Sequence, residues 1–115
     1  VRRGAVGIDL EHHGKVRDQE GIVSRYFHPD EAQAWQCLPA ELQAGAFFRL
    51  WSAREAAMKC AGLGLARGIR VTRIDPGFIE TGAAMARVGE EIFAVNVLAA
   101  PADCTLVVAT SPADD

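Results

Sequence analysis

Three acidic residues stand at positions from which they could hold a divalent cation. Asp9 and Glu11 are two residues apart in an apolar run that predicts a β-strand, so both side chains leave the same face. Glu55 lies in a long predicted helix beside large aromatic residues, where a carboxylate costs free energy unless a cation or hydrogen bonds satisfy it. Mg²⁺ takes carboxylate oxygens together with substrate phosphates as ligands. The three acids therefore predict a magnesium site for a phosphate-bearing substrate.

Two cationic residues on the same helix could neutralise such phosphates. Arg54 adjoins Glu55, and Lys59 follows it by about one helical turn. The same spacing also allows a simpler interpretation, in which Glu55 and Lys59 form an ordinary ion pair on the helix surface. Asp9 and Glu11 could likewise be the solvated end of a strand. Spacing alone leaves both interpretations open.

One strand and one helix must bring these acids together, and the apolar pattern predicts both. The strand is expected at residues 5–11, where every position before the acids is apolar. The helix is expected at residues 40–61, with Gly62 and Gly64 following it as stop signals. These two elements would carry all three candidate metal ligands.

The rest of the pattern predicts an α+β domain over residues 1–110 and a flexible tail at 111–115. The region 78–86 shows no clear pattern. Helical spacing or alternation elsewhere predicts two shorter helices, at 16–27 and 29–38, and three further strands, at 69–74, 92–99 and 104–109. Because one strand and the helices precede several consecutive strands, we expect antiparallel strands packed on the long helix.

Composition narrows the class of protein. With 115 residues, half of them hydrophobic, the chain fits one globular domain. A formal net charge of −3 gives no footprint for nucleic acid or an anionic membrane, and no apolar run approaches the ~18 residues of a membrane span. A cytoplasmic location is therefore expected. The three widely spaced cysteines predict free thiols, and ten arginines against two lysines suggest a GC-rich bacterial genome.

Two motifs together resemble the signature of the 4′-phosphopantetheinyl transferase superfamily. The strand VGIDLE at 6–11 is similar to the family's G-[IV]-D strand, and WSAREAAMK at 51–59 is similar to its W-[ST]-x-K-E-[AS]-x-x-K helix. The glycine-punctuated GLGL at 62–65 and RYF at 25–27, with Glu31 nearby, also look like the family. The acid pair and the tryptophan helix resemble the C-terminal half of Sfp-type members, which are pseudodimers of two similar halves.

The resemblance implies a role for each matching residue. Asp9, Glu11 and Glu55 would hold Mg²⁺, and Lys59 would contact coenzyme A phosphates and assist catalysis. Arg54, where the family usually has lysine, would also bind the phosphates. The proton acceptor would be Glu55, Glu31 or a metal-bound water.

The implied reaction moves 4′-phosphopantetheine from coenzyme A to a serine of an apo carrier protein in fatty acid, polyketide or nonribosomal peptide biosynthesis. The chain would act as a homo-oligomer or together with an N-terminal half that this sequence does not contain. The alternative is a non-catalytic module that kept the fold and binds a carrier protein or coenzyme A.

Overall fold

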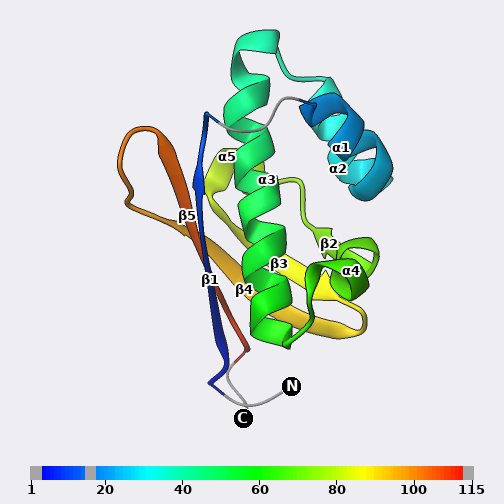
Figure 1. Ribbon diagram of the computed structural model, residues 1–115, viewed down its shortest axis with the longest axis vertical. Helices are drawn as coiled ribbons and strands as arrows, with labels where there is room; N and C mark the ends of the chain where they lie inside the picture. The colour runs from blue at the N-terminus through cyan, green and yellow to red at the C-terminus, as the bar shows by residue number, and fades with distance from the viewer. Residues whose placement is uncertain (1–3, 15–17, 113–115) are drawn as a thin grey trace.

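The computed structural model describes residues 4–14 and 18–112, which form an α+β unit around one antiparallel sheet (Figure 1). Across the sheet the strands run in the order β1-β5-β4-β3-β2, and every neighbouring pair is antiparallel. The five strands are β1 (Val6–His12), β2 (Thr72–Ile74), β3 (Ala83–Val88), β4 (Glu91–Leu98) and β5 (Cys104–Thr110). The predicted fold class, antiparallel strands packed on a long helix, is confirmed.

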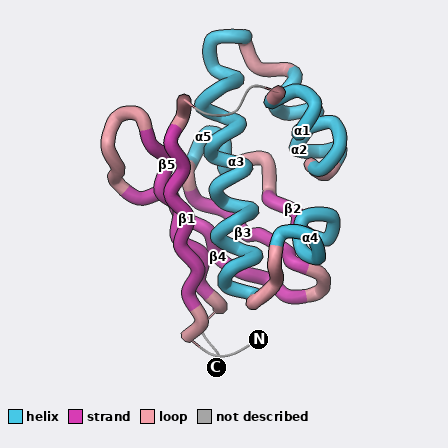
Figure 2. The backbone as a smooth tube through the Cα atoms, viewed as in Figure 1, coloured by secondary structure: helices cyan, strands magenta, loops and turns pink. Residues whose placement is uncertain are grey.

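One long helix, α3 (Ala40–Ala61), lies across one face of the sheet (Figure 2). Its bounds agree with the prediction, and Gly62 ends it with a left-handed φ of 78°. Small residues, among them the fully buried Ala53, Ala56 and Ala57, allow the helix to lie close to the strands. The position of α3 against β1 and β5 determines where its polar residues can reach.

The other helical segments are short and lie along α3. They are α1 (Gln19–Tyr26), α2 (Pro29–Gln36), α4 (Leu65–Gly68), a 3₁₀ turn (Ile69–Val71) and α5 (Phe78–Thr81). The first two lie within the predicted helices, although residues 16 and 17 fall outside the described part of the chain. His28 caps α2, because its Nδ1 accepts a hydrogen bond from the Asp30 N–H at 3.2 Å. None of the described helices has the length and apolar character needed to cross a bilayer.

The strand predicted at 69–74 is wrong over its first half. Ile69–Val71 form the 3₁₀ turn, and only Thr72–Ile74 pair with β3. The Thr72 hydroxyl donates to the Gly68 carbonyl at 2.6 Å, a local bond that favours a turn over a longer ladder. Alternation in the sequence could not reveal this competition.

The segment 78–86, which has no clear sequence pattern, divides between α5 and β3. Gly82 separates them, with a φ of 71° that few other residues adopt. The strands predicted at 92–99 and 104–109 correspond to β4 and β5. The three cysteines are free thiols, as expected, and positions 113–115 of the predicted tail lie outside the described residues.

Strand β1 and helix α3 approach each other most closely at Gly7. A Cβ at this position would overlap the main-chain oxygen of Ala56 and the main-chain nitrogen of Cys60. Only glycine therefore allows the strand to lie against the helix backbone. Asp9 follows two residues later and points to the same side of the strand.

Gly7→Ala should destabilise the protein by roughly 1–3 kcal/mol, because two backbone segments must move apart. Gly45→Ala, in an open position of α3, is the matched control: its Cβ meets no atom within 4 Å. It should stabilise by roughly 0.5–1 kcal/mol through helix propensity. Urea unfolding followed by circular dichroism measures both changes. Equal unfolding free energies for the two variants would contradict the close approach.

Candidate active site

Asp9 is the centre of the polar contacts between β1 and α3. The residue is only 5% exposed, and its side chain faces the helix. The Ser52 hydroxyl lies 2.9 Å from Asp9 Oδ2 and 3.1 Å from the Asp9 carbonyl oxygen, so it ties the side chain and main chain of the strand to the helix. Each carboxylate oxygen of Asp9 thus has a partner on α3, because Lys59 reaches the other one.

Lys59 supplies the positive charge beside Asp9. Its Nζ lies 3.0 Å from Asp9 Oδ1 and donates to the Ile8 carbonyl oxygen, also at 3.0 Å. The Lys59 side chain is 51% exposed whereas that of Asp9 is 6% exposed, so the pair lies at the border between core and solvent. The simple alternative, in which Lys59 pairs with Glu55 on the helix surface, is not the contact that the structure has. The lysine reaches across to the strand instead.

The negative charge of Asp9 acts on both Glu11 and Glu55. The pKa of Glu11 is raised to about 8, mainly by burial and then by its hydrogen bond with Asp9 and the negative charges of Asp9 and Glu55, against the lowering effect of Lys59. Burial and then the charge of Asp9 also raise the pKa of Glu55, against the lowering effect of Lys59. The strand and the helix therefore bring three carboxylates close enough for electrostatic coupling.

The chemistry of these groups suits a hard cation. Three carboxylates offer oxygen ligands, and their mutual repulsion is the kind that a divalent ion relieves. Within residues 4–14 and 18–112, however, no three His, Cys, Asp or Glu side chains are already arranged around one ion position. The Lys59 ammonium beside Asp9 supplies positive charge there. A metal would require Glu11 and Glu55 to adjust toward Asp9.

Arg54 and Glu31, predicted as a phosphate ligand and a possible base, contact each other in the structure. Both side chains are fully buried, and they form a bidentate ion pair in which Arg54 Nη2 lies 3.0 Å from Glu31 Oε2. Arg54 also donates to the Thr72 carbonyl at 2.8 Å, and Glu31 accepts from the Ile74 N–H at 2.9 Å. With Phe27 stacked 4.5 Å from the guanidinium, neither charge faces solvent. The two side chains thus form a buried pair in this structure, and their roles as phosphate ligand and base stay predictions.

Sequence reasoning missed two polar residues that belong to this region. Ser52 precedes Lys59 by seven residues, a spacing that places both on one side of a helix, and this signal could have found it. His13 lies two residues beyond Glu11, just after β1 ends, and its Nε2 is 2.6 Å from the Thr105 hydroxyl oxygen. Its ring also stacks on Phe48 at 4.7 Å, which holds it at the end of the acid row.

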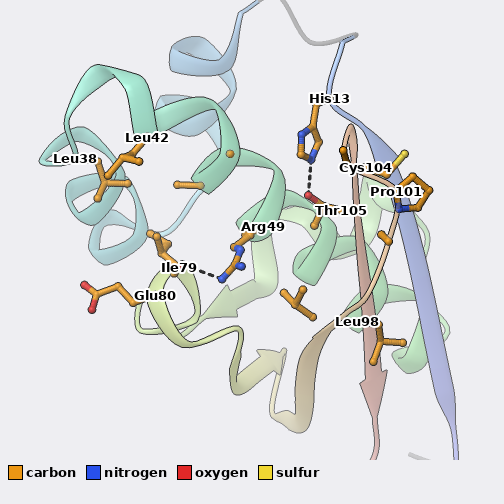
Figure 3. Close-up of a pocket in the computed structure, with 15 residues that line it drawn as sticks. His13, Leu38, Leu42, Arg49, Ile79, Glu80, Leu98, Pro101, Cys104 and Thr105 are labelled. Carbon is orange, nitrogen blue, oxygen red and sulfur yellow. Dashed lines mark hydrogen bonds between the residues drawn. The ribbon is translucent and has the colours of Figure 1, made fainter.

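A cavity of about 510 Å³ begins beside His13 (Figure 3). It lies between the first turns of α3, the β4–β5 loop and α5, and most of its lining is apolar. Arg49 crosses its floor and donates to the Ile79 carbonyl at 3.1 Å. Asp9, Glu11 and Glu55 are not part of this lining. This cavity is therefore separate from the three carboxylates.

Comparison with known proteins identifies the family that combines this fold with this acid-bearing strand and helix. The family model described as the 4′-phosphopantetheinyl transferase superfamily matches residues 5–109, nearly the whole chain. The chain therefore belongs to the 4′-phosphopantetheinyl transferase superfamily, as the two motifs predicted.

Individual relatives carry the same name. The 4′-phosphopantetheinyl transferase HetI of Nostoc sp. is 35% identical over 83 residues, which are 69% of this chain and 35% of that protein. The 4′-phosphopantetheinyl transferase psf-1 of Bacillus pumilus is 41% identical over 64 residues, which are 56% of this chain and 27% of that protein. The chain thus matches about a third or less of the length of these relatives.

The buried pair gives a test that separates structure from catalysis. Glu31→Ala leaves a buried, unpaired guanidinium and should destabilise the fold by about 3–5 kcal/mol. The double variant Glu31→Leu with Arg54→Met removes both charges and should lower the unfolding free energy much less than Glu31→Ala does. Urea unfolding of the three proteins measures this. If Glu31→Ala unfolds at the same denaturant concentration as the unmodified protein, the assigned structural role is wrong.

The raised pKa of Glu11 predicts that the protein, free of divalent cations, loses stability as the pH rises. The folded protein binds the Glu11 proton more tightly than the unfolded chain does. This contribution is therefore complete below the ordinary value of 4.5 and is lost as the pH passes through about 8. Glu11→Gln should flatten the decline, which urea unfolding in the presence of a chelator across this interval would reveal. An unchanged slope in the variant would contradict the coupling of the carboxylates.

Proposed function

We propose that this chain carries the magnesium-binding part of an enzyme that transfers 4′-phosphopantetheine from coenzyme A to a serine of an apo carrier protein. One observation carries the proposal. In a member of this superfamily, the carboxylates of Asp9, Glu11 and Glu55 on β1 and α3 interact electrostatically near the half-exposed Lys59. Acids and a cation at the border of the core suit a substrate that combines Mg²⁺ with a pyrophosphate.

Asp9, Glu11 and Glu55 would hold the ion, with Ser52 keeping the Asp9 carboxylate in place. The metal would supply charge stabilisation at the pyrophosphate oxygens. Lys59 reaches Asp9 from an exposed position, so its ammonium can exchange this partner for a phosphate oxygen. The metal ion and the Lys59 ammonium would then both stabilise the negative charge that develops during the transfer.

The transfer forms a bond between the serine oxygen of the carrier protein and the pantetheine-side phosphorus. The bond from that phosphorus to the bridging oxygen breaks, and 3′,5′-ADP leaves. The serine proton must move to a base, and Glu55 is our choice because Glu31 is buried and paired. Such reactions are accelerated mainly by alignment of the reacting groups and by charge stabilisation. The main requirement on the carboxylates is therefore a fixed position.

Further polypeptide completes the site in this proposal, because the chain matches only about a third of HetI. That polypeptide is a second copy of the chain or an N-terminal half. The carrier protein would belong to fatty acid, polyketide or nonribosomal peptide biosynthesis, and a cytoplasmic location goes with coenzyme A as substrate.

Asp9→Asn and Glu55→Gln should each lower magnesium-dependent transfer by about 10²–10³-fold, because each removes a charge that holds the ion at the reacting phosphate. Glu41→Gln, an equal change at the exposed start of α3, should leave the rate unchanged. The assay follows labelled phosphopantetheine from coenzyme A onto an apo carrier protein.

Calorimetric titration with coenzyme A and Mg²⁺ completes this experiment. Binding that needs Mg²⁺ but yields no transfer to any apo carrier protein would favour the alternative, a non-catalytic module. Transfer that is insensitive to Asp9→Asn would refute the assignment of the metal ligands.

A further inference from the structure

The cavity beside His13 is a part of the molecule that the proposed transfer does not use. It lies between the first turns of α3, helix α5 and the β4–β5 loop (Figure 3). Its volume of about 510 Å³ falls within the roughly 300–1,000 Å³ of small-molecule sites in proteins. The candidate metal ligands and Lys59 are not part of its described lining. The cavity therefore has room for a small organic molecule outside the transfer site.

Most of the cavity wall is apolar, and its apolar side chains come from separate segments of the chain. Leu42 and Ala46 lie on α3, Ile79 lies on α5 and Leu98 ends β4. Leu42 and Leu98 are 55% and 42% exposed, although contact with water is unfavourable for large apolar side chains. An apolar molecule in the cavity would shield both leucines from water. The wall thus suits a ligand with an apolar body.

Arg49 brings a positive charge to the floor of this cavity (Figure 3). The side chain is half-buried, and its Nη1 donates to the Ile79 carbonyl oxygen at 3.1 Å. A Cβ at Gly82 would lie 3.5 Å from the same nitrogen, so the guanidinium packs over this glycine. One hydrogen bond to a neutral carbonyl does not balance the charge and uses only part of the donor capacity of an arginine.

No carboxylate of the described residues forms an ion pair with Arg49. Glu80 is the acid of the described lining, but it is exposed and its carboxylate points away from the guanidinium in Figure 3. His13 and Thr105, which also line the cavity, already contact each other at 2.6 Å. Burial of a charge without an opposite charge is unfavourable. Arg49 is therefore the group that the polar end of a ligand would contact.

We propose that this cavity binds a small amphipathic carboxylate, whose alkyl or aryl body packs on the apolar wall and whose carboxylate pairs with Arg49. The planar guanidinium matches the geometry of a carboxylate, and charge-assisted hydrogen bonds are stronger than neutral ones. A neutral or cationic ligand would leave the arginine without an anionic partner. The proposal concerns a second site and does not depend on the transferase activity proposed above.

Calorimetric titration of the complete chain with octanoate, without coenzyme A or metal, tests the proposal. We expect saturable binding of octanoate. Arg49→Met keeps an apolar side chain of similar length but removes the charge, so it should raise the dissociation constant of octanoate by roughly tenfold or more. The same variant should bind octan-1-ol as tightly as the unmodified protein does, because this probe has no charge. That difference separates loss of the ion pair from damage to the cavity.

Two further variants serve as controls. Arg67→Met makes the same change at an exposed position of α4, outside the lining, and should leave octanoate binding unchanged. Gly45→Leu adds a side chain to the cavity wall at a position where a Cβ meets no atom within 4 Å. It should weaken the binding of both probes, because the leucine takes up space in the cavity. Circular dichroism identifies the folded variants, and only these are compared.

Three results would overturn the proposal. The first is absence of saturable octanoate binding to the unmodified protein, including absence because further polypeptide covers the cavity. The second is Arg49→Met binding octanoate as tightly as the unmodified protein does. The third is displacement of octanoate by coenzyme A, which would assign the cavity to the transfer substrate. Failure of phosphopantetheine transfer would refute the proposed function alone, because octanoate binding is measured without the transfer substrates.

Discussion

The contact between β1 and the middle of α3 is the constraint on which the candidate site depends. Gly7 brings the strand against the helix backbone, since any larger residue would meet main-chain atoms of Ala56 and Cys60. At that separation Ser52 reaches both the carboxylate and the carbonyl of Asp9. A strand held farther away would leave Asp9 buried without these partners, which costs free energy. Close backbone packing and the charge arrangement are therefore one feature of the molecule.

Helix α3 carries two charged groups that are neutralised in different ways. On one side, Arg54 and Glu31 form a closed pair that joins α2, α3 and β2, and its hydrogen bonds reach the main chain at Thr72 and Ile74. The planar guanidinium suits this bidentate geometry better than an ammonium would. Asp9 and Lys59 form an open pair at the edge of the core. Of the two pairs, only the second is in contact with solvent.

Strand β1 divides its two faces between two kinds of contact. Gly7, Asp9 and Glu11 face the helix, whereas the even positions from Val6 to Leu10 are exposed on the opposite face of the sheet. The period of two residues in a strand makes this division automatic. As an edge strand of the sheet, β1 has only β5 as a neighbour. In the described structure its position thus depends on one strand and the helix.

The sequence by itself determined the long helix, the fold class and the family. Apolar spacing and the glycine stop signals sufficed for α3, and two motifs at a set spacing sufficed for the superfamily. These properties are local or depend on residue order, so they can be read along the chain. The facing of Asp9 and Glu11 to one side also followed from strand geometry alone.

Tertiary structure decided what each charge does. Arg54 and Glu55 are neighbours in sequence, but adjacent helix positions point about 100° apart. Arg54 is therefore buried in the core with Glu31, whereas Glu55 lies on the side where the charge of Asp9 acts on it. Their partners come from segments more than twenty residues away, and no pattern within the helix names them. Burial and pairing depend on distant contacts, which is why the motif alone could not tell that Arg54 is buried with Glu31 while Lys59 is half exposed.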